Sequence, residues 1–473
     1  MRAADERLPA PKPMKDRYDV VIVGAGAMGL ASAYHLIESQ PRLTVLVVDA
    51  RSRPGEGSMG ASNGMVRDVF SSADNRVLAQ SSIAFYRGLM REHEELRAPA
   101  PLLDLYGYLW LLPERHWKEY LALVSGARGS IDAEPVGLDA LRTCPGLEIA
   151  PERWFEGDRA DPPDPIVGGL FGRNCGAVAP ELLANFYFER AKSRGVEFAF
   201  DTTVQRLSFE GREEILLHED SKRPFSFQEQ MRGRLRISRV DFGDGRSVRT
   251  DKVIVAAGAW AEKILHPLGV ATACSPRAQL LFSVSGPVVE ELLRWEPPVR
   301  PIDTDNGRAR FPFLILPTGA VLKPIFPQRQ IWIGYVDTVA HRIGTREDPA
   351  TEGRLDYSMA RMGERDAFAT DALPLVTPYL PRFETAGVRL ENSWGGYYNF
   401  SPEGLPVLTE EPYGVIFVGG DSGSAIMKAD SIGRLVAAMY DGKSQAQLFG
   451  GESYRLERLS LARRAVEEEK IIL

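Results

Sequence analysis

The sequence predicts an α/β fold in which a Rossmann-like dinucleotide-binding domain is interleaved with a substrate domain built on an antiparallel sheet. The first observation is the stretch 19–33, where four apolar residues lead into glycines at G-x-G-x-x-G spacing. The second is a similar succession of strand, small-residue turn and helix at residues 415–440. The third is the stretch 277–343, where short apolar runs alternate with Pro and Gly turns, which is typical of an antiparallel sheet.

Each glycine of the first motif has a physical role in a dinucleotide site. Gly24 permits a tight turn, Gly26 lets the backbone approach a pyrophosphate, and Gly29 lets the following helix pack closely against the strand. That helix, expected from residue 27 to about residue 39, offers its N-terminal N–H groups to the phosphates. The next predicted strand, 43–48, ends in Asp49, at the distance expected for a carboxylate that accepts hydrogen bonds from ribose hydroxyls.

Length and composition narrow the class of protein. A chain of 473 residues is too long for one ordinary core, so two closely packed domains are expected. The net charge of −7 and the lack of a long basic run argue against a nucleic-acid partner. Residues 1–17 predict a disordered tail rather than a signal peptide, and no stretch is long enough to cross a bilayer, so a cytoplasmic location is expected.

The cysteines do not predict a metal site. Cys144, Cys175 and Cys274 are isolated in the sequence. An odd number without paired spacing argues against a disulfide framework or a structural zinc, and no metal is expected.

The first half of the chain contains a Gly- and Ser-rich loop at residues 55–64, which follows the second strand and is placed to wrap a cofactor. Further along, Gly195 stops a well-patterned helix. The polar stretch 210–234 predicts an inserted hairpin to which we assign no function. The remaining elements expected here are helices over 74–96 and 181–194, strands over 102–112, 196–200 and 204–209, and loops with short helices over 127–165.

Two segments in the second half end in small residues. A hairpin, 237–250, precedes an apolar strand that runs into Ala257, Gly258 and Trp260, where backbone can lie close to a flat ligand. After the strand 415–418, the turn 419–425 points the helix expected over 426–440 at an anionic group, and this suits the edge of a flavin that gains negative charge on reduction. The alternative is a plain βα unit.

Taken together, these motifs resemble the D-amino-acid oxidase, glycine oxidase and sarcosine oxidase family of FAD-dependent oxidoreductases. The resemblance spans residues 19–442. It implies FAD as cofactor, an antiparallel sheet over the flavin face, and removal of a hydride from a carbon that bears nitrogen. It also extends to the branch that contains a mitochondrial complex I assembly factor, through Trp394 to Tyr398 and the tail after Gly442. The motifs that carry it are Gly24 to Gly29, Gly60 to Ser62, Gly176 to Pro180, Ala256 to Trp260, Trp394 to Gly404, and Gly423.

The resemblance implies a set of cofactor-binding residues and a non-covalent FAD. Where sarcosine oxidases attach the flavin through a Cys, this chain has Gly396, and no His stands between residues 55 and 67 for the other familiar attachment. The FAD-binding residues expected from the motifs are Gly24, Gly26, Ala27, Met28, Gly29, Asp49, Ala50, Ala61, Ser62, Asn63, Val204, Ala257, Gly258, Trp260, Gly423, Ser424, Ala425 and Ile426.

The catalytic residues implied by the resemblance are Arg67, Lys323, Tyr398 and Lys428. Arg67 matches a flavin-proximal arginine and Tyr398 an active-site tyrosine, whereas Lys323 stands where many relatives place an Arg. Each of these three residues could instead be ordinary surface or core.

Three positions of the resemblance depart from the sarcosine-type pattern. The two positions of the carboxylate clamp fall on Phe70 and Met427, with Lys428 adjacent to the second. The position of the oxygen-activating lysine falls on Trp332, although Lys323 could take over that role.

The sequence therefore predicts an enzyme that oxidises the C–N bond of an amine or amino acid with FAD, acting as a dehydrogenase with a quinone or protein acceptor. The alternatives are an FAD-dependent 2-hydroxy-acid dehydrogenase and a non-catalytic FAD-bearing assembly or scaffold protein; the oligomeric state stays open. The domains expected are an FAD domain over 18–98, 166–270 and 392–445, a substrate domain over 99–165 and 271–391, and a C-terminal extension over 446–473.

Overall fold

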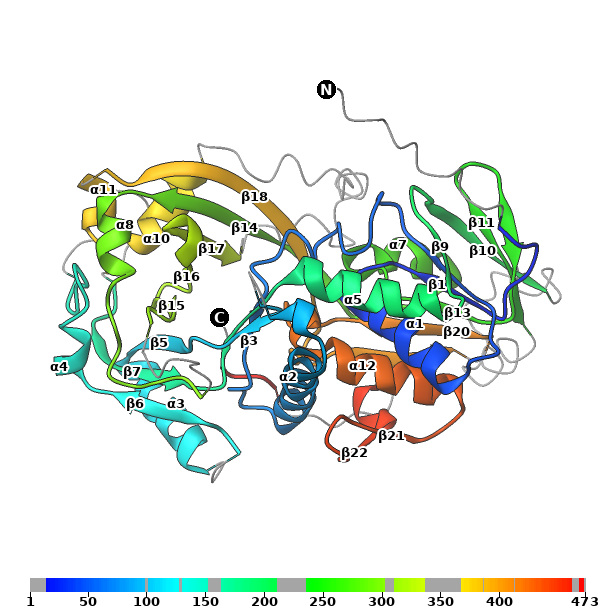
Figure 1. Ribbon diagram of the computed structural model, residues 1–473, viewed down its shortest axis with the longest axis horizontal. Helices are drawn as coiled ribbons and strands as arrows, with labels where there is room; N and C mark the ends of the chain where they lie inside the picture. The colour runs from blue at the N-terminus through cyan, green and yellow to red at the C-terminus, as the bar shows by residue number, and fades with distance from the viewer. Residues whose placement is uncertain are drawn as a thin grey trace, which may run out of the picture.

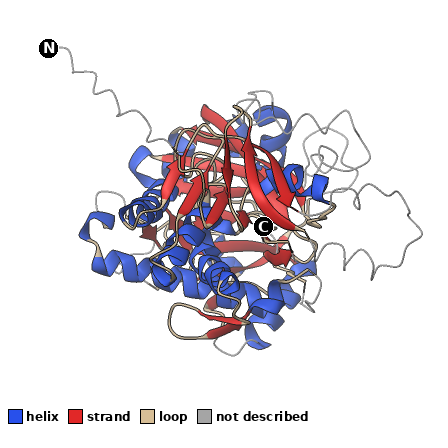
Figure 2. Cartoon of the chain, turned by 90° about the vertical axis from the view of Figure 1, so that its right-hand side faces the viewer, coloured by secondary structure: helices blue, strands red, loops and turns tan. Residues whose placement is uncertain are grey.

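The computed structural model describes residues 14–97, 101–126, 130–151, 163–210, 235–302, 310–336, 367–385, 387–411, 413–461 and 468–471. Two large sheets organise these residues, and Figure 1 shows them in the right-hand and left-hand parts of the molecule. The long strand β18 (Arg389–Phe400) runs from one part towards the other. Figure 2 shows helices gathered around the strands. None of the helices among the described residues is long and apolar enough to cross a membrane.

The first large sheet has six strands, of which five are parallel and one, at the edge, is antiparallel. Its central strand is buried along its whole length, and Val21 to Val23 pair with one neighbour while Val20 to Val23 pair with the other. The all-apolar run therefore forms a doubly covered parallel strand, as predicted. In sheet order the strands are β19 (Val407–Glu411), β20 (Val415–Gly419), β13 (Val253–Val255), β1 (Val20–Val23), β2 (Val45–Val48) and β9 (Glu197–Ala199).

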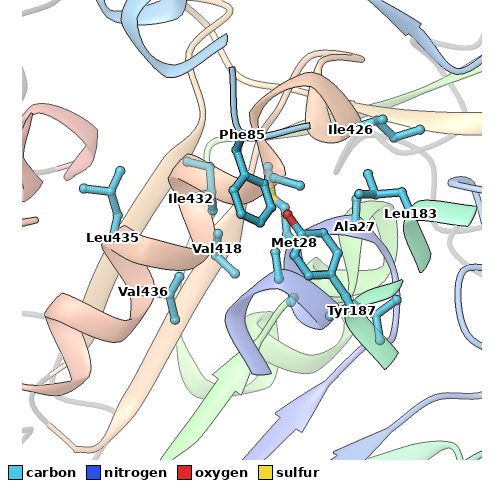
Figure 3. Close-up of a cluster of buried hydrophobic side chains, with 14 of the residues drawn as sticks. Ala27, Met28, Phe85, Leu183, Tyr187, Val418, Ile426, Ile432, Leu435 and Val436 are labelled. Carbon is cyan, nitrogen blue, oxygen red and sulfur yellow. The ribbon is translucent and has the colours of Figure 1, made fainter. Parts of the chain in front are cut away.

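Four helices build a hydrophobic core against one face of this sheet. Figure 3 shows Met28, Phe85, Tyr187 and Ile432 meeting there, one side chain from each helix. The other face is covered by the three-stranded sheet β10-β11-β12 and the short α7 (Ala261–Leu265). The elements involved are α1 (Ala27–Ser39), α2 (Ala73–Glu92), α5 (Pro180–Ser193), α12 (Ala425–Tyr440), β10 (Val204–Glu210), β11 (Arg236–Phe242) and β12 (Ser247–Arg249).

The second large sheet has eight strands and is antiparallel except where β5 and β15 run parallel. One face is covered by short helices and carries a second core, and the opposite face looks towards the first domain. In sheet order the strands are β18, β14 (Ser275–Ser285), β17 (Gln330–Val336), β16 (Val321–Ile325), β15 (Phe313–Ile315), β5 (Tyr108–Pro113), β7 (Ile166–Gly172) and β6 (Ala133–Val136). The helices beside it are α3 (Glu114–Gly126), α4 (Leu138–Leu141), α8 (Pro287–Leu292), α10 (Leu373–Val376) and α11 (Arg382–Thr385).

Two small sheets complete the described strands besides the three-stranded sheet above. One has three strands, and the other, which follows α12 in the chain, has two. Their strands are β3 (Met65–Val66), β8 (Gly176–Val178), β4 (Leu103–Asp104), β21 (Gln445–Gln447) and β22 (Ser453–Arg455).

Three predicted elements differ from the structure. The helix expected over 74–96 ends at Glu92 because His93 is extended, and a 3₁₀ turn follows it. The strand expected over 102–112 is divided into β4 and β5 by Gly107, whose φ is +85° and whose absent side chain leaves room for the Phe171 ring. Within 127–165, where loops and short helices were expected, β6 adds an edge strand to the eight-stranded sheet.

Sheet pairing also changes the domain boundaries. Strands β7 and β18 belong to the eight-stranded sheet, so residues 166–172 and 392–400, which were expected in the FAD domain, lie with the substrate domain. Of the tail expected over 1–17, Lys15 forms an ion pair with Glu197 at 2.7 Å. The insertion predicted at 210–234 lies outside the described residues apart from its first position.

Candidate functional site

A cavity runs between the two domains, from the β1–α1 turn to the start of α12. Its walls come from both large sheets and from the 55–64 loop. The lining residues that the sequence motifs predicted are Gly24, Gly26, Ala27, Met28, Asp49, Ala50, Ser62, Asn63, Val204, Ala257, Gly258, Trp260, Tyr398, Gly423, Ala425 and Ile426.

The glycine triplet forms one end of the cavity. Gly24 has φ +109°, and a Cβ there would stand 2.4 Å from the Ala256 carbonyl oxygen. A Cβ at Gly29 would stand 1.9 Å from the Gly24 carbonyl oxygen, so glycine lets α1 approach the strand. Next to Gly26 no atom of the described chain lies within 4 Å of the Cβ position, which leaves open space for a ligand beside the backbone. This arrangement fits a pyrophosphate.

Asp49 stands at the same end. Its two carboxylate oxygens accept hydrogen bonds from the backbone N–H groups of Ala25 (2.6 Å) and Arg51 (2.8 Å). Burial raises the pKa of Asp49, while these two donors act in the opposite direction. The side chain is therefore held in one orientation towards the cavity, where it fits a pair of ribose hydroxyls.

Arg51 is a cavity residue that the sequence analysis missed. Its Nη2 atom is buried and has no hydrogen-bond partner among the described residues. A buried guanidinium nitrogen without a partner fits an anionic or hydrogen-bonding ligand. Its position directly after Asp49–Ala50 was the only sequence signal for it.

The opposite end of the cavity is formed by β18 and the turn before α12. Tyr398 and Asn399 line it, and the Asn399 amide donates to the carbonyl of Gly258 at 3.1 Å. A Cβ at Gly423 would stand 2.8 Å from the Tyr398 ring, so glycine allows this close approach. Burial, and then the Asp421 carboxylate, raise the pKa of Tyr398, so the phenol keeps its proton at neutral pH.

Asp421 changes the expectation for the start of α12. Its Oδ1 atom accepts hydrogen bonds from the N–H groups of Gly423 (3.0 Å) and Ala425 (3.3 Å), which were expected to face an anionic ligand edge. Burial raises the pKa of Asp421, and Lys428 acts against that rise. Asp421 is also one of the residues that line the cavity. The sequence showed Asp421 within the Gly- and Ser-rich turn, but nothing there indicated that it would cap the helix.

Strand register shows which side chains share the cavity-facing side of the eight-stranded sheet. Residues directly opposite each other in an antiparallel pair point to the same face. Tyr398 is opposite Arg277, Leu281 is opposite Trp394, and Trp332 is opposite both Ser283 and Lys323. The Trp394 indole donates to the carbonyl of Ala61 at 3.0 Å, so this face of the sheet contacts the 55–64 loop. These aromatic side chains continue the sheet face on which Tyr398 borders this end of the cavity.

Lys323 lies beside this aromatic group rather than in the cavity lining. Its Nζ atom is 4.8 Å from the centre of the Trp332 ring and donates to the carbonyl of Asn63. Burial lowers the pKa of Lys323 to about 8. Trp332 in turn packs edge-on against Trp394, with ring centres 4.8 Å apart.

Arg67 and Lys428, the other two cations expected at the site, also lie outside the cavity lining. Arg67 is buried and donates to the carbonyls of Val69 (2.7 Å) and Ile471 (2.8 Å). Lys428 is fully buried and donates at 2.6 Å both to Asn75 and to the Ser424 hydroxyl. Burial lowers the pKa of Lys428 to about 7.

Three of the expected cofactor residues lie behind the cavity wall. Gly29 contacts the Gly24 backbone, Ala61 accepts from Trp394, and Ser424 contacts Lys428. Of the four residues expected to act in catalysis, Tyr398 lines the cavity. Besides Arg51 and Asp421, the lining residues that the sequence analysis did not name as site residues include Ser58, Met59, Thr202, Thr203, Tyr397 and Asn399.

These features together fit FAD. The space at Gly26, the carboxylate of Asp49 and the unpaired Nη2 atom of Arg51 fit the adenosine diphosphate part. The other end borders the sheet face that carries Tyr398, and a flat ring system fits there because the adjoining turn is built of small residues such as Gly258.

Comparison with known proteins agrees with this geometry. The family described as FAD dependent oxidoreductase matches residues 19–439. FAD-dependent oxidoreductase domain-containing protein 1 of Xenopus laevis is 26% identical over 436 residues, covering 90% of this chain and 79% of that protein. Sarcosine oxidase subunit beta of Rhizobium meliloti is 28% identical over 193 residues, covering 40% of this chain and 42% of that protein.

Solved structures share the fold. Glycine oxidase from Geobacillus kaustophilus superposes with a TM-score of 0.65 at 20% identity, covering 95% of this chain and all of that chain (100%). L-proline dehydrogenase from P. horikoshii superposes with a TM-score of 0.64 at 17% identity, covering 94% and 97%.

Proposed function

Because this chain belongs to the family of FAD-dependent oxidoreductases, we propose that it oxidises the C–N bond of a small amine or amino acid and passes the electrons to an acceptor other than oxygen. FAD, when bound, supplies the hydride acceptor for this chemistry. The protein contributes the binding of the cofactor, the orientation of the substrate and the exclusion of water.

The observation that carries the proposal is the position of the flavin end of the cavity against the aromatic face of the eight-stranded sheet. Tyr398 lines this end, and Trp394 and Trp332 continue the same face. A substrate held between that face and the cofactor would be shielded from solvent and fixed in orientation. No acid–base pair is required, because a neutral amine gives up a hydride without one.

The names of similar proteins support the substrate class. They include sarcosine oxidase subunit beta, glycine oxidase and L-proline dehydrogenase, each named for an amine or amino-acid substrate. The fold itself hosts more than one chemistry, so the substrate has to be tested on this protein.

The choice of acceptor rests on Trp332. Its position matches that of the oxygen-activating lysine in sarcosine-type oxidases, and an indole carries no charge with which to stabilise superoxide. Lys323 is the nearest cation to this ring, but its ammonium is directed at Trp332 and at the Asn63 carbonyl. We therefore propose a dehydrogenase with a quinone or protein acceptor.

The test is an anaerobic screen of the FAD-loaded protein against amines, amino acids and 2-hydroxy acids, with flavin absorbance as the measurement. Bleaching by an amine or amino acid supports the proposal. Bleaching by 2-hydroxy acids alone would assign the site to hydroxy-acid oxidation. If no compound of either class reduces the bound FAD, both amine oxidation and hydroxy-acid oxidation are contradicted. An assembly or scaffold role is then favoured.

A further inference from the structure

We propose that residues 468–471, here called the 468–471 segment, occupy the guanidinium of Arg67 and so exclude carboxylates from it. The enzyme would then act on amines without a neighbouring carboxylate rather than on amino acids. This inference rests on the proposed function and narrows its substrate class. It is carried by the contacts of Glu469 and Ile471, neither of which the sequence analysis connected with the site.

Glu469 anchors the segment at the start of α2. Its Oε1 atom accepts from the backbone N–H and the hydroxyl of Ser71, at 2.8 and 2.9 Å. Its Oε2 atom accepts at 3.1 Å from both the Ser72 N–H and the Asn75 amide. Oε1 also accepts from the N–H of Ile471 at 3.0 Å. The carboxylate is nearly buried, at 8% exposed, so its hydrogen bonds, rather than water, stabilise its charge.

Ile471 places the segment against the sheet face that looks towards the cofactor. Its side chain is fully buried in the cluster that contains Met65, Trp110 and Val321. Its carbonyl accepts the 2.8 Å hydrogen bond from Arg67 Nη2. A backbone carbonyl therefore occupies the hydrogen-bonding position on Nη2 that a carboxylate oxygen would need, and an apolar side chain fills the space beside it.

Two other contacts also occupy the guanidinium of Arg67. Its Nη1 atom donates to the Val69 carbonyl, and the guanidinium stacks 4.1 Å from the centre of the Phe70 ring. A guanidinium that already donates to two carbonyls in a buried site offers little to a ligand unless one of those acceptors leaves. The acceptor that a local movement could remove is Ile471.

Lys428 is held by the same group of residues. Asn75 donates to Glu469 through its amide nitrogen and accepts from Lys428 through its amide oxygen. The ammonium also lies 4.7 Å from the centre of the Phe70 ring, on which Arg67 stacks. The segment thus contacts Arg67 directly and holds in place Asn75, the partner of Lys428, the cation adjacent to the second clamp position.

The charges in the cavity lining favour an amine. Among the described residues that line it, the charged ones are Asp49 and Arg51 at the nucleotide end and Asp421 at the flavin end. A carboxylate at the flavin end opposes a second carboxylate, whereas the neutral amine from which a hydride leaves carries no charge for it to oppose.

The experiment measures carboxylate binding and needs no turnover. The full-length, FAD-loaded protein is titrated with acetate and propionate, with acetamide as the neutral probe, and the flavin spectrum is recorded. We expect no spectral change in the wild type or in the control Lys470→Ala, whose side chain lies 60% exposed in the same segment. Glu469→Ala should loosen the segment and free Arg67. Its affinity for the carboxylates should exceed that of the wild type by roughly tenfold or more, which is the effect of one charge-assisted hydrogen bond.

Adding Arg67→Met to Glu469→Ala should abolish the gained binding, while acetamide should remain silent throughout. The proposal would be overturned if the wild type and Glu469→Ala bound the carboxylates equally strongly. It would also be overturned if the double variant with Arg67→Met still bound them as tightly as Glu469→Ala does. If Glu469→Ala does not retain FAD, Glu469→Gln replaces it, and a silent spectrum there overturns the proposal as well. Failure of the amine screen would not change these results, because the titration does not depend on catalysis.

Discussion

The ammonium of Lys323 lies 4.8 Å from the centre of the Trp332 ring, and the two residues face each other across the β16–β17 pair. The cation is therefore directed onto an aromatic face and a backbone carbonyl, with 9% of the residue exposed. A cation over an indole ring is stabilised by the ring's quadrupole. This arrangement turns the positive charge of Lys323 towards a bulky neutral side chain.

We expect the substrate-reduced enzyme to reoxidise slowly in air and faster with a quinone or dye, because Trp332 supplies no charge at the position of the oxygen-activating lysine. Stopped-flow mixing of the reduced enzyme with oxygen measures this rate. Trp332→Lys should increase it, and Lys323→Met is the matched control, which should leave the slow rate unchanged. Reoxidation by air as fast as reduction by substrate would contradict the prediction. If that fast reoxidation were then lost in Lys323→Met, Lys323 would be the oxygen-activating group.

Asp49→Ala should weaken FAD binding by roughly 1–3 kcal/mol, the range of a charge-assisted hydrogen bond whose loss leaves a partner unpaired. The effect includes a looser β1–α1 turn, because Asp49 also accepts from the Ala25 N–H. The dissociation constant of FAD from the apoprotein measures it. Asp244→Ala removes a carboxylate from a surface turn and serves as the control, with unchanged affinity expected. Equal affinities in the two variants would show that Asp49 does not hold the cofactor.

FAD should be bound without a covalent link, since Gly396 replaces the cysteine of sarcosine oxidases. The Cβ position of Gly396 lies 3.5 Å from Ala61 and 3.6 Å from Ser58, so the 55–64 loop covers it closely. Precipitation with acid should leave the yellow colour in the supernatant. Flavin that remains with the pellet would show that another residue forms the attachment.

Asp421→Asn should shift the midpoint potential of the bound flavin to more positive values. Reduction adds negative charge at the end of the cavity that Asp421 lines, and a carboxylate there opposes it. Asparagine can still accept from the Gly423 and Ala425 N–H groups, so the cap on α12 is retained. The difference between the two proteins should shrink as pH falls, because burial raises the pKa of Asp421 and the protonated acid carries no charge. Spectroelectrochemical titration of both proteins at several pH values measures the difference. If the wild type and Asp421→Asn have the same midpoint potential at every pH, the prediction is contradicted.

Asp68→Asn should stabilise the protein at neutral pH. Asp68 is buried, accepts from Asn174 at 2.7 Å, and has one carboxylate oxygen without a partner among the described residues. Burial raises its pKa from 3.8 to about 6, so the folded protein holds a proton that the unfolded chain releases between these values. Stability is therefore lost as pH rises through this window, by about 3 kcal/mol at most for a shift of this size.

Asparagine does not titrate, so the variant should exceed the wild type in unfolding free energy at about pH 8 and match it more closely at about pH 4. Urea unfolding at the two pH values measures the difference. A gap that is independent of pH would show that Asp68 is not the titrating group.

The sequence by itself determined the nucleotide half of the fold and site. The strand β1, the turn at Gly24 and Gly26, the start of α1 and Asp49 follow one another within about one βαβ unit, and local sterics dictate their geometry. The helix α12 was predictable for the same reason, since its periodicity and its small-residue turn are local. The family resemblance rested on these same motifs.

Tertiary structure decided the role of the charged residues. Arg67 meets Ile471 across 404 positions of sequence, Lys428 meets Asn75 across 353, and Lys323 meets Asn63 across 260. No local pattern encodes such contacts, because they depend on which strands become neighbours and on the register of their pairing. The edge strand β6 and the placement of β7 were missed for the same reason. A cation placed by sequence near a site acquires its function only when the fold determines which acceptors it meets and how far it is from water.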